Sequence, residues 1–296
     1  MTSHQAHFAP ASPLVEFWND ILVPKCLAYQ HILVGGLSRH SDHVFPDLPV
    51  HQGQNILDVG CGFGDTAIAL ARKTGPAGHV LGVDCCPAFL ERARQYADQS
   101  QASNVGFACA DAERFLPRGS FDQVFSRFGT MFFANPVAGL RNMRQALKPG
   151  GRLTHIVWRQ RTDNPWLAAA RDVLLEMLPQ PDDNAPSCGP GPFSMADPDL
   201  TRNQMAAAGF HDITFKRIDA MVLVGRDIEE AINFQLALGP AGEIYRNAGI
   251  QADQKRPEIV RNLRALFEKE TRDRRGIWMK SSSWMITAQG QPSPLL

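Results

Sequence analysis

The sequence predicts an α/β fold: a doubly wound, mostly parallel sheet with helices on both of its faces. Apolar, strand-like runs alternate with helix-length segments between residues 55 and 158, and strands separated in this way return in the same direction. The run at 80–83 is apolar without alternation, which suits a strand that is buried on both faces. The first run breaks into a glycine-rich turn, and later runs end in aspartate. This pattern favours an open sheet with a ligand site at one edge.

The expected elements follow the chain in order. Residues 14–34 are predicted to form one or two helices interrupted at Pro24, and residues 35–54 a connection rich in His, Pro, Asp and Gly. The core should then comprise strands at 55–59, 79–83, 104–109, 121–125 and 151–158, and helices at 65–73, 87–99 and 136–147. Later come helices at 165–178, 197–208, 227–240 and 256–274, strands at 211–223 and 276–288, and a proline-rich loop at 179–192.

The composition is that of an ordinary globular protein of 296 residues, with 44% hydrophobic and 20% charged residues. Thirty basic residues balance thirty acidic ones, which argues against a large nucleic-acid-binding surface. No apolar run is long enough to span a bilayer, and residues 1–13 lack the regions of a secretory signal, so we expect a cytoplasmic protein. The six cysteines show no CxxC pair and are expected to be buried and reduced, without a metal.

The segment 55–65 carries the strongest functional signal. An apolar strand passes through Asp58 into glycines at 60, 62 and 64, and a helical stretch follows at once. Glycine permits positive φ and a close approach of ligand to the main chain, while a helix amino terminus offers free N–H groups. This arrangement is typical of a nucleotide-binding βαβ unit.

The spacing of the glycines separates two cofactor classes. A dinucleotide site prefers its third glycine one residue later than Gly64. Asp84 ends the second strand, twenty residues after Gly64, where its carboxylate can accept both ribose hydroxyls. Asp111 ends the third strand, where a carboxylate can accept from an adenine amino group while the N–H of Ala112 meets a ring nitrogen.

Together these segments resemble the class I S-adenosylmethionine-dependent methyltransferases. The resemblance covers about residues 50–160, and its five ordered motifs are residues 57–64, 83–84, 110–112, 121–124 and 147–153. It implies a seven-stranded Rossmann-like sheet whose last strand, near 281–288, is antiparallel. It also divides the chain into three parts, which are a helical lid and connection at 1–50, a cofactor-binding core at 51–160, and the rest of the sheet at 161–296 with a helical insertion at about 226–275.

The resemblance implies roles for named residues. The turn at 60–64 would receive the methionine portion, with Asp58 near its ammonium; Asp84 would hold the ribose, and Asp111 the adenine. Cys85 or Cys86 would form a wall of the adenine slot. Each acid alone is more commonly an ordinary strand-end or helix-capping residue. The expected cofactor-binding residues are Asp58, Gly60, Cys61, Gly62, Gly64, Asp84, Cys85, Asp111, Ala112, Ser126 and Phe128.

The acceptor of the methyl group is less determined by the sequence. Methyl transfer is an in-line displacement, and a base is needed only when the acceptor holds its proton. Aromatic residues at 17, 18, 29, 132, 133 and 158 favour an enclosed apolar pocket for a small, partly apolar metabolite methylated on oxygen, carbon or nitrogen. The candidate bases are Tyr29, His31 and His155, although a histidine within a strand is more often a core residue.

Other functions stay open. An RNA or protein methyltransferase, a non-catalytic S-adenosylmethionine-binding partner and an NAD-dependent oxidoreductase are the alternatives. The segment 128–147 is loosely similar to the quinone C-methyltransferase branch. Asp182-Asp183 gives no clear metal site, and arsenite chemistry would depend on Cys26 and Cys188. The partner is expected to be a small molecule, and a homodimer is left open.

Overall fold

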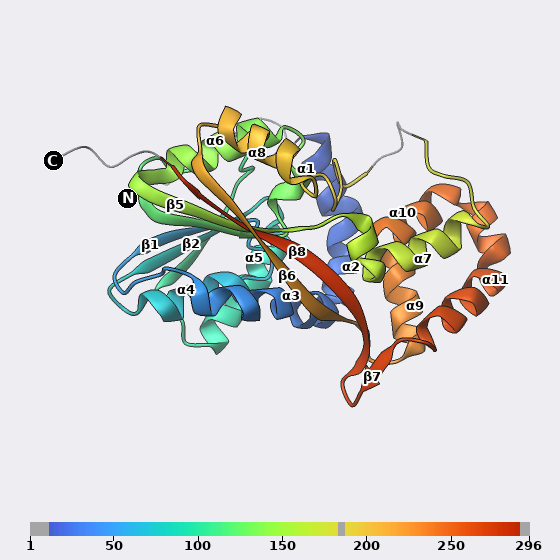
Figure 1. The fold of residues 1–296 in the computed structure, drawn as a ribbon. Helices are drawn as coiled ribbons and strands as arrows, with labels where there is room; N and C mark the ends of the chain where they lie inside the picture. Colours follow the sequence, from blue (N-terminus) through green and yellow to red (C-terminus); the bar gives the residue numbers. More distant parts are fainter. Residues whose placement is uncertain (1–11, 183–186, 291–296) are drawn as a thin grey trace.

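The computed structural model describes residues 12–182 and 187–290, which build one eight-stranded sheet (Figure 1). Its order is β3-β2-β1-β4-β5-β8-β6, with short β7 paired to β8. The strands are β1 Asn55–Val59, β2 His79–Asp84, β3 Val105–Cys109, β4 Phe121–Arg127, β5 Leu147–Trp158, β6 His211–Gly225, β7 Thr271–Asp273 and β8 Gly276–Gln289. The predicted doubly wound, mostly parallel sheet is confirmed, with β8 antiparallel to both β5 and β6. The eighth strand is the three-residue β7, too short to read from sequence.

Helices cover both faces of the sheet, with α4 and α5 on one and α6 and α8 on the other (Figure 1). Their ends carry the capping residues that the sequence indicates: Asn135 accepts from the Ala138 N–H, and Asp197 accepts from the Asp199 and Leu200 N–H groups. Gly209 follows α8 with φ +94°, the left-handed position that ends many helices. The bounds are α4 Asp65–Thr74, α5 Pro87–Gln99, α6 Pro136–Ala146 and α8 Pro198–Ala207.

The remaining helices come before β1 or after β5 in the chain. Those before the sheet are α1 Pro13–Phe17, the π-helix η1 Trp18–Leu22, α2 Val23–Ala28, α3 Gln30–Val44 and the short η2 Phe45–Asp47. Those after β5 are α7 Pro165–Leu175, α9 Ile228–Ala237, α10 Gly239–Ala248 and α11 Ile250–Phe267. Single turns lie at η3 Thr130–Phe132 and η4 Arg161–Asp163. The later helices gather beside the far end of β6 and β8 (Figure 1).

Two expectations for the amino-terminal region were wrong. Pro24 does not interrupt the helices, because it lies in the first turn of α2, where the missing N–H costs nothing; the break falls at Tyr29. The expected connection from residue 35 is instead the second half of α3, which runs through Gly35 and Gly36. A Cβ at Gly36 would lie 3.1 Å from the Leu223 carbonyl oxygen, so the glycine permits α3 to pack closely on β6.

Several boundaries also differ from the prediction. Strand β5 begins at Leu147 because the Lys-Pro-Gly-Gly turn is already paired at its start, Leu147 with Phe121. The expected helix at 227–240 is split at Leu238, which has extended backbone. The expected helix at 256–274 begins earlier, as α11, and stops at Phe267. The proline-rich loop is confirmed for its described residues, whereas Asp183 lies outside them, as do residues 1–11.

Within the described ranges, no single helix is both long and apolar enough to cross a membrane. One bent helix pair, Pro13–Ala28 with Gln30–Asp47 at 86°, passes the same test of length and composition.

Candidate functional site

A cavity of about 320 Å³ lies where the strand order reverses, between β1 and β4. Ligands of open α/β sheets bind at this point, beyond the carboxyl ends of the strands. We call the part lined by residues 59–133 the cofactor half. The lid half is lined by residues of α1–α3, Trp158, α7, residues 188–192, α9 and α10. The two halves form one continuous space.

The glycine turn is packed on one side and open on the other. Gly60, Gly62 and Gly64 all have positive φ, at +69°, +52° and +80°. A Cβ at Gly64 would lie 2.7 Å from the Ala93 Cβ, whereas a Cβ at Gly62 would meet nothing within 4 Å. Gly62 lines the cavity, so its bare backbone leaves room for a ligand.

Asp84 ties the second strand to this turn. Its Oδ2 accepts the Gly62 N–H at 2.9 Å, and its Oδ1 accepts the Cys86 N–H at 2.9 Å. Burial raises the pKa of the Asp84 carboxyl, while these amide hydrogen bonds act in the opposite direction. Because a carboxylate oxygen can accept more than one hydrogen bond, Asp84 retains acceptor capacity for two hydroxyls.

Asp111 and Ala112 lie at the end of β3 and line the same cavity. Asp111 Oδ1 accepts the Glu113 N–H at 3.0 Å, which fixes the carboxylate at the strand end. The glycine turn, Asp84 and Asp111 are therefore brought together as the sequence predicts. The open cradle at Gly62 and the spare acceptors at these carboxylates fit an adenosine-bearing cofactor.

Asp58 lies behind the glycine turn, completely buried, and does not line the cavity. Its Oδ2 accepts the Thr66 hydroxyl at 2.6 Å, and its Oδ1 has no partner among the described residues. Burial raises the pKa of Asp58 to about 7. The geometry gives Asp58 a role in positioning the turn and the start of α4.

Arg127 and Asp65 are further charged residues that line the cofactor half, and neither was among the predicted cofactor-binding residues. Arg127 Nη2 lies 2.8 Å from Asp65 Oδ2, and its Nη1 donates to the Ser41 hydroxyl of α3 at 2.9 Å. The signal was present, because Arg127 directly precedes Phe128 at a strand end. Its partners were not foreseeable, since Asp65 and Ser41 are distant in sequence.

An aromatic group forms the floor between the two halves. Phe128 stacks on Trp158, with centroids 3.8 Å apart and planes 11° from parallel. The backbone of Phe128 has φ +56°, an unfavourable value for a bulky residue, and this turn directs the ring into the cavity. The buried His40 ring lies perpendicular to both rings, with its centroid 5.5 Å from that of Phe128 and 5.0 Å from that of Trp158.

The remaining predicted cofactor contacts divide into two groups. Cys61 and Cys85 line the cavity. Ser126 is completely buried and does not line it; its hydroxyl oxygen would be 3.1 Å from a Cβ at Gly129 and has no partner in the described parts of the chain.

None of the three candidate bases lines the cavity. His31 Nε2 lies 3.0 Å from Glu230 Oε1, with 42% of its side chain exposed. The Tyr29 ring packs edge-on against Phe234. His155 is completely buried in β5, which lowers its pKa to about 3, and its Nδ1 lies 3.0 Å from the Thr130 hydroxyl.

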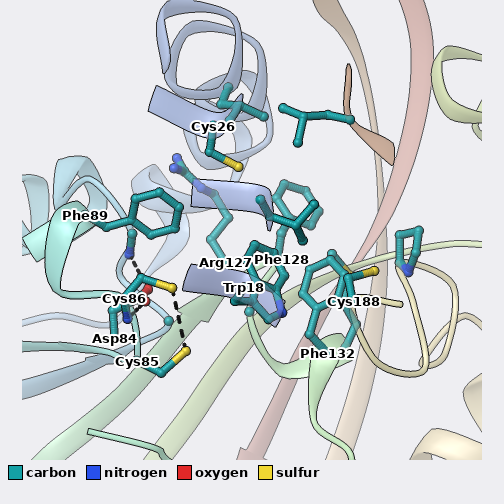
Figure 2. A pocket seen from close by; sticks show the side chains of 18 of the residues that line it. Trp18, Cys26, Asp84, Cys85, Cys86, Phe89, Arg127, Phe128, Phe132 and Cys188 are labelled. Carbon is teal, nitrogen blue, oxygen red and sulfur yellow. Dashed lines mark hydrogen bonds between the residues drawn. The ribbon is translucent and has the colours of Figure 1, made fainter. Parts of the chain in front are cut away.

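Thiols surround the cavity on several sides. Figure 2 shows Cys85 and Cys86 beside Asp84, with Cys26 and Cys188 approaching from the lid. All six cysteines of the chain are free. Burial raises the pKa of Cys26 and of Cys188 to about 12, so both remain protonated thiols rather than the thiolates that bind soft metals.

These features define a class of protein: a Rossmann-like sheet with a nucleotide site made by a short-spaced glycine turn and two acid-ended strands. Residues 50–178 match a family described as "Methyltransferase domain". This match covers less than half of the chain. Within it the chain is similar to the S-adenosylmethionine-dependent methyltransferases, and the cofactor that this similarity gives is S-adenosylmethionine. The resemblance drawn from the sequence is confirmed.

Individual relatives agree with this assignment. A demethylmenaquinone methyltransferase of Listeria welshimeri is 38% identical over 108 residues, which are 36% of this chain and 46% of the relative. A ubiquinone/menaquinone biosynthesis C-methyltransferase of Pseudomonas putida is 34% identical over 145 residues, 48% of this chain and 56% of the relative. The chain thus spans about half the length of the curated relatives it matches.

Solved structures share the fold at low identity. Phosphoethanolamine N-methyltransferase 2 of Haemonchus contortus, with phosphomonomethylethanolamine and S-adenosylhomocysteine bound, has a TM-score of 0.58 and 17% identity over 97% of this chain and 62% of that one. The [4+2]-cyclase SpnF has a TM-score of 0.50 and 21% identity over 86% of this chain and 82% of that one. The same fold thus carries more than one reported activity.

Proposed function

We propose that the protein transfers the methyl group of S-adenosylmethionine to oxygen, carbon or nitrogen of a small, partly apolar metabolite. The observation that carries this proposal is the continuity of the cavity. Its cofactor half contains the glycine turn and both strand-end acids, and its lid half is walled by apolar and aromatic side chains. A small acceptor in the lid half would therefore lie directly against the cofactor.

The cofactor supplies an electrophilic methyl group on a sulfonium, and the chain supplies alignment and desolvation. Asp84 and Asp111 would hold the polar parts of the cofactor through hydrogen bonds. Trp18 of the lid packs edge-on against Phe132 of the core, with centroids 5.0 Å apart, so the lid and the core meet at the wall of the cavity (Figure 2). Excluding water strengthens the electrostatic interactions that hold the reactants.

The relatives support an apolar acceptor. Two of them are named as methyltransferases of quinone biosynthesis, and a planar aromatic molecule would suit a cavity floored by Phe128 and Trp158. An RNA or protein acceptor is less well supported, because the cavity is enclosed by helices and the chain has no net charge.

The direct test is calorimetric titration of the full chain with S-adenosylmethionine and S-adenosylhomocysteine, followed by an assay of S-adenosylhomocysteine release with naphthols, catechols and quinols. Binding of both with release of product supports the proposal. If neither ligand binds at high micromolar concentration, the proposal fails. Binding without release from any acceptor would favour a non-catalytic or non-transferring role like that of the cyclase.

A further inference from the structure

Arg246 is a cation in the largely apolar lid half of the cavity. It lies in the last turn of α10, and its guanidinium is 5.1 Å from the centroid of the Phe17 ring. Both residues line the cavity, and the lid half has one other charged side chain among the described lining residues, Glu243.

A second cation lies close by, on α2. Burial, and then the charge of Arg246, lower the pKa of Lys25, so the two cations repel one another. Among the residues that the structure describes, no hydrogen bond or ion pair joins either cationic group to an acceptor; the ring of Phe17 is the described contact of Arg246. Half-buried cations without a counterion are unusual, because charge is costly to desolvate unless it is paired.

Glu243 does not neutralise this pair. It precedes Arg246 by one helical turn, yet the two side chains form no ion pair in the described chain. Burial raises the pKa of Glu243, while the charge of Arg246 acts in the opposite direction. Arg246 and Glu243 line the cavity, and Lys25 adds a second positive charge behind Arg246, so this end of the lid carries an excess of positive charge.

A simpler explanation is that Arg246 stabilises the carboxyl end of α10 through the helix dipole. That explanation requires only an exposed side chain at the helix end. It does not account for a half-buried guanidinium that lines a ligand cavity, nor for the neighbouring Lys25 on a different helix.

We propose that Arg246, assisted by Lys25, binds an anionic group of the methyl acceptor, so that the acceptor is an amphipathic acid with an apolar or aromatic body. The body would lie over the Phe128–Trp158 floor, and a carboxylate or phosphate would reach the lid end. The guanidinium suits this task because its planar fork pairs with two oxygens at once. This inference rests on the proposed function, since it concerns the acceptor half of the same cavity.

Two fluorescent probes with the same aromatic body test the inference on the full chain saturated with S-adenosylhomocysteine. Anilinonaphthalene sulfonate is anionic, and N-phenylnaphthylamine lacks the sulfonate. We expect the wild type to bind the anionic probe more tightly. Arg246→Gln should weaken binding of the anionic probe by about tenfold, because one charge-assisted hydrogen bond is lost. The affinity for the neutral probe should not change.

Glu243→Gln should have the opposite effect on the affinity for the anionic probe, because removing the carboxylate should tighten its binding. Arg261→Gln is the matched control, since Arg261 on α11 has a side chain that is 72% exposed and lies outside the cavity; it should alter neither probe. The inference would be overturned if Arg246→Gln lowered the affinity for both probes equally, or if the wild type bound the anionic probe no more tightly than the neutral one. If adenosylhomocysteine binding persists in that case, the proposed function survives; if it is absent throughout, the proposed function itself has failed.

Discussion

The cofactor half of the cavity is built from residues 59–133, whereas the lid half collects side chains from α1, α10 and several segments between them. In the cofactor half, the glycine turn, Asp84 and Asp111 lie at or just after the ends of strands, so their places are decided by local sequence. In the lid half, residues such as Cys26 and Cys188 approach the same space from distant parts of the chain (Figure 2). The residues that bind the methyl donor can therefore be recognised in short sequence motifs. The residues around the acceptor are brought together only by tertiary packing.

The largest expected effect concerns the buried carboxyl behind the glycine turn. The folded pKa of Asp58 is raised from 3.8 to about 7, so the folded state retains a proton that the unfolded state has released. The contribution of Asp58 to stability is thus favourable below about pH 4 and is lost as the pH rises to about 7. This corresponds to at most about 4 kcal/mol.

Asp58→Asn removes this dependence. Denaturant unfolding of both proteins at pH 4, 5.5, 7 and 8.5 should show the variant gaining stability relative to wild type up to about pH 7, with no further change above it. The difference between the two curves of stability against pH removes the contributions of His40 and His155, because both histidines are present in both proteins. A difference that is independent of pH would contradict a raised pKa at Asp58.

Loss of Asp84 tests the cofactor half at its centre. Asp84→Ala should weaken binding of S-adenosylhomocysteine by about 1.5–3 kcal/mol, because hydrogen bonds to a charged acceptor are lost. Calorimetry measures the effect. Arg246→Gln is the control from the lid half and should leave this affinity unchanged; similar losses in both variants would remove the distinction between the halves.

The close contact of α3 with β6 tests the lid half. Gly36→Val should lower the free energy of unfolding by about 1–3 kcal/mol, because its side chain must displace the Leu223 backbone. The affinity for S-adenosylhomocysteine should remain unchanged in the folded fraction. If the variant is as stable as wild type, the packing of α3 on β6 is not as the structure shows.

The smallest expected effect on stability is that of a substitution at Gly35, the residue before Gly36. A Cβ at Gly35 would meet nothing within 4 Å, so Gly35→Ala should stabilise the protein by about 0.5–1 kcal/mol through helix propensity alone. Thermal unfolding compares the two glycine variants directly. A loss of stability at residue 35 would indicate that α3 does not extend through the pair.

These contrasts explain what the sequence could and could not predict. The turn at 60–64, Asp84 and Asp111 were predictable because strand, turn and helix are adjacent in the chain. The second half of α3 was missed because paired glycines oppose helix formation locally, and the reason for Gly36 is a contact with a strand nearly two hundred residues later. Arg246 carried no signal, since an arginine near a helix end is ordinary until α10 is placed over the cavity.

The pairing of β6 and β8 has a mechanical consequence. β5 stops pairing with β8 at Trp158 and Ser283, while β6 and β8 continue together as far as Gly225 and Ile277. This free ribbon carries α9–α11 at its tip and α3 against its side (Figure 1). Because α3 and α9 both pack on β6, the two parts of the lid share one strand pair as their support. A substitution that displaces this strand pair would therefore alter both walls of the lid half together.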